Sequence, residues 1–123
     1  MKKIPLNSLP APPRGPWLSE PALRLYNLLG NTLVRRGLLF EGQETKLALL
    51  VGTLLFFEQV HEMDKQIRLS DPGAYQNRIE RMKFQIIRLE KRLEKFGFSR
   101  ADLSELGMIW PGDILSNKKQ TPE

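Results

Sequence analysis

Four titratable side chains between positions 58 and 64 are where catalysis or metal binding would first be sought in this sequence. His61 is the only histidine, and Glu58, Glu62 and Asp64 surround it. A zinc site usually needs several nitrogen or sulfur ligands, and this chain has one histidine and no cysteine. Glu58 and Glu62 are four residues apart and would share one helix face, where charged groups are usually solvated. We therefore interpret the group as an exposed helix surface and expect no metal and no cofactor.

The patterns of other catalytic sites are not found either. No nucleophile-elbow motif accompanies a serine, and the glycines are isolated at expected helix ends instead of forming a phosphate-binding loop. The absence of cysteine excludes thiol chemistry and disulfides. We predict that the chain is not an enzyme.

The charge balance points to an anionic partner. The 123 residues include 19 Lys and Arg against 14 Asp and Glu, a net charge of +5. Nucleic acid is the commonest partner of such a basic chain. The most apolar run, residues 47–57, is too short to span a bilayer, and no apolar leader follows the basic N-terminus. We expect a cytoplasmic protein with no membrane partner.

Local signals predict four helices. Ser19 is a suitable N-cap for a first helix to about Arg36, which Gly37 would end. A second helix should begin between residues 41 and 45 and reach about residue 69. Its first half is apolar on every side, so it must be surrounded.

The remaining two helices follow a turn. Asp71 before Pro72 fits an N-cap and first helical position, and Gly97 would end this third helix after Phe96. Ser99 and Asp102 suggest a capping box for a short fourth helix. We predict an all-α fold: a long antiparallel hairpin of the second and third helices, a leading first helix and a short C-terminal fourth helix.

Proline divides the N-terminus from the rest of the chain. Residues 1–16 contain five prolines and should form an extended basic arm, because proline fixes φ and biases its predecessor towards extended conformations. We expect the ordered part to start near Trp17. The predicted domains are the arm at 1–16, a helical domain at 17–107 and a C-terminal tail at 108–123.

A row of cations in the third helix is the main candidate for binding DNA. When the helix is drawn at ~100° per residue, four of its cations fall within a sector of roughly 60°. These four are Arg81, Arg88, Arg92 and Lys95. Such a row could follow a phosphate backbone, and the alternative is a solvated charged face. The candidate DNA-binding residues, including those of the arm, are Arg81, Arg88, Arg92, Lys95, Lys2, Lys3 and Arg14.

Apolar residues without an expected cover predict self-association. The second helix is apolar all round, and Phe84 and Ile87 fall outside the main apolar stripe of the third helix. We therefore expect a homo-oligomer. The candidate interface residues are Leu50, Leu54, Phe56, Phe57, Phe84 and Ile87.

Several segments together carry a resemblance to a known family. They are the basic, proline-rich start, the run from Trp17 to Tyr26, the sequence Arg36-Gly37-Leu38-Leu39, the polar Glu41-Gly42-Gln43-Glu44 and the closing run from Phe96 to Leu103. Over about residues 14–107 the chain resembles the short helical family of small terminase subunits of tailed double-stranded DNA phages. It departs from that family at Arg100, where proline is frequent, and in the short connection before the third helix.

The resemblance implies a ring-forming protein that recognises the packaging-initiation site on viral DNA and regulates a large subunit holding the ATPase and nuclease. The implied partners are double-stranded DNA, further copies of the chain and the large terminase subunit, in the cytoplasm of a bacterial host. Two alternatives stay open. The connection at 36–42 between the first two helices could belong to a helix-turn-helix transcriptional regulator, or the chain could be an oligomeric adaptor that binds protein only.

Overall fold

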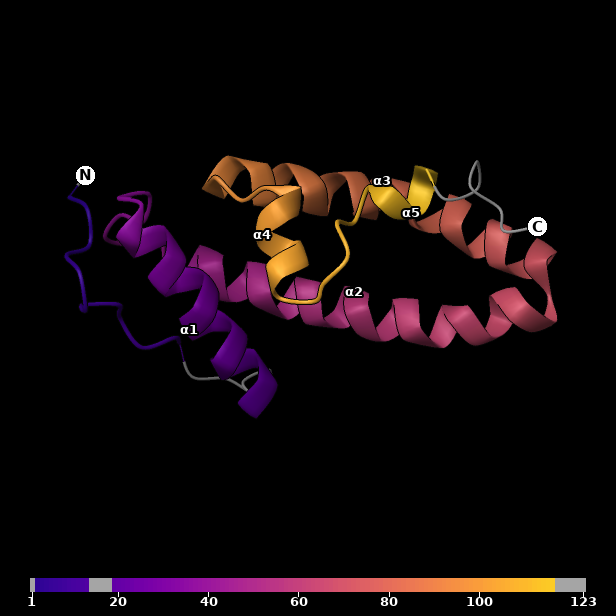
Figure 1. Cartoon of the computed structure of the whole chain (residues 1–123), viewed down its shortest axis with the longest axis horizontal. Helices are drawn as coiled ribbons and strands as arrows, with labels where there is room; N and C mark the ends of the chain where they lie inside the picture. Colours follow the sequence, from indigo (N-terminus) through magenta and orange to yellow (C-terminus); the bar gives the residue numbers. More distant parts are fainter. Residues whose placement is uncertain (1, 14–18, 117–123) are drawn as a thin grey trace. The chain divides into compact units, whose positions relative to one another are not determined.

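The computed structural model describes residues 2–13 and 19–116, and this part of the chain is helical with no strand (Figure 1). Five helices follow one another in it: α1 (Glu20–Arg35), α2 (Glu44–Ser70), α3 (Pro72–Phe96), α4 (Arg100–Glu105) and α5 (Asp113–Ser116). The predicted all-α class and the long pair of helices, α2 and α3, are confirmed.

The chain divides into two compact units inside α2. The N-terminal unit is Met1–Leu55 and the C-terminal unit is Phe56–Glu123. The predicted helical domain at 17–107 therefore contains parts of both units. Each unit is described separately below.

The boundaries of α1 follow from its own sequence, as predicted. The Ser19 hydroxyl accepts a hydrogen bond from the Ala22 amide at 3.2 Å, which satisfies one of the free N–H groups at the helix start. At the other end Gly37 has a φ of 68°, a left-handed conformation that glycine adopts without steric cost. The Leu38 amide then donates to the Leu33 carbonyl at 2.8 Å, which ends the helix.

Residues 2–13 pack against the rest of the N-terminal unit, whereas the sequence predicted an arm outside the ordered part of the chain. The Ile4 amide donates to the Leu39 carbonyl at 2.9 Å, and the Ile4 side chain is buried. The Tyr26 hydroxyl, itself buried, donates to the Pro10 carbonyl at 2.9 Å, and burial raises the pKa of Tyr26 to about 12. Order therefore begins well before Trp17. Prolines prevent a helix here, but they leave an extended segment free to bury one apolar side chain and to pair locally.

In the C-terminal unit the chain reverses at Asp71. The Asp71 carboxylate accepts from the Ala74 amide at 3.1 Å, Pro72 occupies the first turn of α3, and Gly97 ends the helix with a φ of 100°. Asp64 and Arg78, each seven residues from Asp71, form an ion pair with 2.6 Å between Oδ1 and Nε. This cross-link joins the C-terminal part of α2 to the start of α3, which run antiparallel (Figure 1).

The segment after α4 is folded up to residue 116, where the sequence predicted a tail. The capping box of Ser99 and Asp102 is present at the start of α4, as predicted. Beyond it, Trp110 and Ile114 are buried and α5 forms, held by Arg100, which donates to both carboxylate oxygens of Asp113. A four-residue helix between glycine and polar residues has no periodicity to reveal it in sequence. The rest of the predicted tail lies outside the described residues.

Candidate nucleic-acid interface

Helix α3 separates an apolar face from a basic one. Its buried side chains recur at helical spacing: Tyr75, Ile79, Ile86, Leu89 and Leu93. The four predicted cations lie on a different face and are all exposed: Arg81, Arg88, Arg92 and Lys95. We call these four the α3 basic row. The structure therefore brings together the four predicted DNA-binding residues of the third helix.

The cations of the basic row lie outside the ion pairs that form at Glu62, Asp64 and Asp113 in the described part of the chain. Residues 78–95 hold seven Lys and Arg against three Glu, a difference of +4. From Arg81 to Lys95 the helix rises about 21 Å at 1.5 Å per residue. The row is thus an extended, exposed strip of positive charge, which suits a polyanion better than a single small anion.

Phe84 is the most exposed aromatic side chain on α3 and lies beside the basic row. Its side chain is 78% exposed. It stands three residues after Arg81 and four before Arg88, the spacings that place side chains next to one another on a helix surface. Sequence reasoning assigned Phe84 to a contact between copies and overlooked its basic neighbours.

The structure gives less information about the basic residues predicted in the arm than about those of α3. Lys2 and Lys3 are exposed in the N-terminal unit, where the Lys2 carbonyl accepts from the Glu41 amide at 2.9 Å. Arg14 lies outside the described residues. The α3 basic row is therefore the candidate interface with the clearest geometry.

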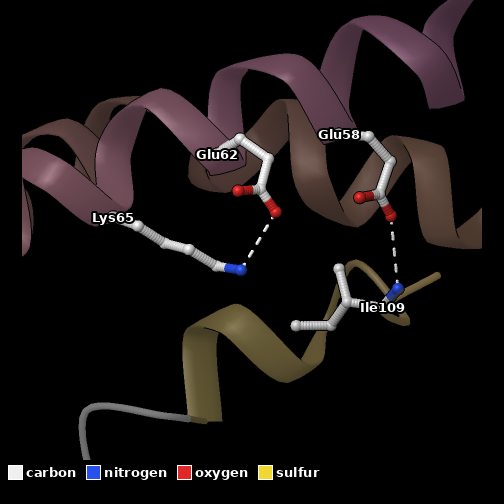
Figure 2. A network of polar contacts seen from close by, with 4 residues as sticks. All are labelled: Glu58, Glu62, Lys65 and Ile109. Carbon is white, nitrogen blue, oxygen red and sulfur yellow. Dashed lines mark hydrogen bonds and ion pairs between the residues drawn. The ribbon is translucent and has the colours of Figure 1, made fainter. Parts of the chain in front are cut away.

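The carboxylates around His61 are engaged in separate structural contacts. Glu58 Oε1 accepts from the Ile109 amide at 3.2 Å, and Glu62 pairs with Lys65 at 3.0 Å (Figure 2). Asp64, 1% exposed, is held by Arg78. Across the described ranges, no group of three or more His, Cys, Asp or Glu side chains is arranged to hold a metal ion.

His61 itself differs from the expected exposed histidine. It is half-buried, with its ring stacked on Phe57 at 6.3 Å between centroids and 5° between planes. Burial, reinforced by the positive charge of Lys65, lowers the pKa of His61. Its Nδ1 atom is buried and has no hydrogen-bond partner among the described residues. The imidazole thus packs against the Phe57 ring.

Three of the six predicted interface residues are covered within the single chain. Leu50, Leu54 and Phe57 are buried, and we no longer assign them to contacts between copies. They belong to the inward side of α2, which the sequence of one helix cannot separate from the outward side when both are apolar. Phe56 and Phe84 are exposed and Ile87 is half-buried, so these three stay available.

One face of α2 in the C-terminal unit is both apolar and exposed. Phe56 and Met63 are 64% and 66% exposed, and Val60 and Ile67 between and beyond them are half-buried. We call these four residues the α2 apolar stripe. Their spacing of three and four residues places them on one side of the helix.

No helix within the described ranges is long and apolar enough to cross a membrane. Comparisons with protein-family models, curated proteins and solved structures found no match to this chain.

Proposed function

We propose that this chain is a non-catalytic, self-associating subunit that binds double-stranded DNA, in the manner of a small terminase subunit. In that role it would recognise the site where packaging starts and regulate a large subunit that carries the ATPase and nuclease. The resemblance of residues 14–107 to that family motivates the role. The observation that carries DNA binding is the exposed α3 basic row.

Phosphate contacts make a specific prediction about salt. Each phosphate that a Lys or Arg neutralises releases counterions, so the logarithm of the affinity falls with the logarithm of salt concentration by about 0.9 per contact. Replacing Arg81, Arg88 and Arg92 with alanine should weaken duplex binding and make this slope shallower by about 2 to 3. Because phosphates carry little sequence information, the loss should be similar on unrelated sequences.

Mobility-shift titrations of the full chain over a series of salt concentrations test this. A matched control replaces Arg24, Lys46 and Lys83, three exposed cations outside the row, and so removes the same net charge. Equal losses for the two triple variants would show that only net charge matters. Unchanged binding by the Arg81, Arg88 and Arg92 variant would remove α3 from the DNA surface. A strong preference for one short palindrome would favour a transcriptional regulator instead.

Self-association is the second part of the proposal, and the α2 apolar stripe supports it. Phe56, Val60, Met63 and Ile67 are uncharged, and the neighbouring Gln59 and Gln66 are neutral as well. Two copies of a chain with a net charge of +5 repel each other over most surfaces, but these stripes can meet without like-charge repulsion. A second copy is therefore the occupant that we propose for the stripe.

Light scattering after size-exclusion chromatography measures the assembly. Replacing Phe56 and Met63 with glutamate should reduce the mass to that of one chain, whereas Leu69→Glu, at an exposed position outside the stripe, should not. A two-fold contact through the stripe would give a dimer, and a head-to-tail contact would give the ring that the resemblance implies. A wild-type monomer at tens of micromolar would refute self-association and leave the DNA test unaffected.

A further inference from the structure

Phe84 is an exposed aromatic side chain with cations next to it on α3, and this combination restricts the kind of partner that can cover it. Phe84 is 78% exposed, with Arg81 and Arg88 on the adjacent turns and Lys91 seven residues further along α3. All three cations are exposed. Glu80, also exposed, stands four residues before Phe84, so the cations outnumber the one neighbouring carboxylate, and a partner that covers the ring must accept a net positive charge around it.

A second copy of the chain does not fit this face through a two-fold contact. In a two-fold contact the same patch of each copy meets its equivalent, so the arginines of both chains would be brought together. Like charges opposed across an interface are strongly unfavourable. The fitting partner is one that combines closely spaced negative charges with flat apolar surfaces, and nucleic acid has both.

The state of the nucleic acid matters, because a ring can stack only on a base face that is open. In a duplex the base faces cover one another, and inserting a side chain requires a base step to be unstacked. In a single strand each base has a free face, and stacking on an aromatic side chain is favourable whatever the sequence. In an intact duplex bound to the basic row, the Phe84 ring has no open base face on which to stack. In an unpaired strand it has one.

We infer that the exposed face of α3 binds single-stranded nucleic acid, with the Phe84 ring stacked on a base and the basic row on neighbouring phosphates. This inference rests on the proposed function for the phosphate contacts, and it adds a preference for unpaired bases. Such a preference would direct the protein to opened or terminal regions of a DNA duplex.

Fluorescence anisotropy with a labelled single strand of about 15 nucleotides and a duplex of the same sequence tests the inference on the full chain. Phe84→Leu keeps an apolar side chain but loses the aromatic face, and should weaken single-strand binding at least about fivefold. Duplex binding should change by less than about twofold, because the phosphate contacts are kept. Phe84→Trp, which offers a larger aromatic face, should restore single-strand binding.

Leu69→Ala is the matched control, since Leu69 is an exposed apolar residue on α2 that lies outside both the basic row and the α2 apolar stripe. It should leave both affinities unchanged. Single-strand binding by Phe84→Leu equal to wild type would overturn the inference while leaving DNA binding by the basic row intact. If the Arg81, Arg88 and Arg92 variant also bound both probes like wild type, the proposed DNA surface and this inference would fall together.

Discussion

The buried ion pair of the C-terminal unit allows an asymmetric prediction about stability. Asp64 is 1% exposed, whereas the Arg78 side chain is 43% exposed. Replacing Arg78 with methionine leaves a buried carboxylate without its counterion, and breaking buried pairs in this way costs about 3–5 kcal/mol in general. Because part of Arg78 reaches solvent, water can partly replace it, and we expect a loss of about 3 kcal/mol.

Removing the other partner should be milder. Asp64→Leu leaves Arg78 with access to water, so we expect a loss of about 1 kcal/mol, the net contribution of one hydrogen bond. The double variant, Asp64→Leu with Arg78→Met, contains no buried charge at this position and should be close to wild type, since apolar residues often replace buried pairs without loss. The two substitutions should therefore be strongly non-additive.

Equilibrium unfolding in urea, followed by circular dichroism, measures these differences. With a slope of about 2 kcal/mol per molar, Arg78→Met should lower the midpoint by about 1.5 M and Asp64→Leu by about 0.5 M. The reasoning would be refuted if Asp64→Leu were the more damaging single change, or if the two losses simply added in the double variant. Either result would mean that the buried carboxylate is not the costly group.

Two further predictions concern His61 and the glycines. Because burial lowers the pKa of His61 below 6.5, the folded state binds its proton less readily than the unfolded chain, so this contribution to stability is present above pH 6.5 and is lost as pH falls. His61→Phe should therefore lose less stability than wild type between about pH 7.5 and 5.5 in urea titrations, and equal pH dependence would contradict this. Gly52 lies inside α2, and a Cβ atom added there would meet nothing within 4 Å, so Gly52→Ala should stabilise by up to about 1 kcal/mol. Gly97→Ala should destabilise by about 1 kcal/mol or more, because Gly97 has a φ of 100°. Thermal melts of the two variants should shift in opposite directions, and shifts of the same sign would show that backbone conformation does not decide the outcome.

Sequence by itself determined where the principal helices begin and end. The caps at Ser19, Asp71 and Ser99, and the left-handed glycines at 37 and 97, act on backbone groups only a few residues away. Such interactions depend on local order along the chain, so residue types at short spacing predict them. The exposed basic row of α3 was predictable for the same reason, because helical periodicity alone separates it from the apolar face.

Tertiary structure decided which of several apolar segments are covered. It buries Ile4 of the proline-rich segment, Trp110 and Ile114 of the predicted tail, and Leu50 and Leu54 of α2, while it leaves Phe56 exposed on the same helix. It also pairs Asp64 with Arg78 across a turn and half-buries His61 against Phe57. The residue types show that all of these side chains can be buried or paired. Whether a side chain is buried depends on which other residues lie next to it in the folded chain. Only the folded arrangement of distant segments determines which side of an all-apolar helix meets them.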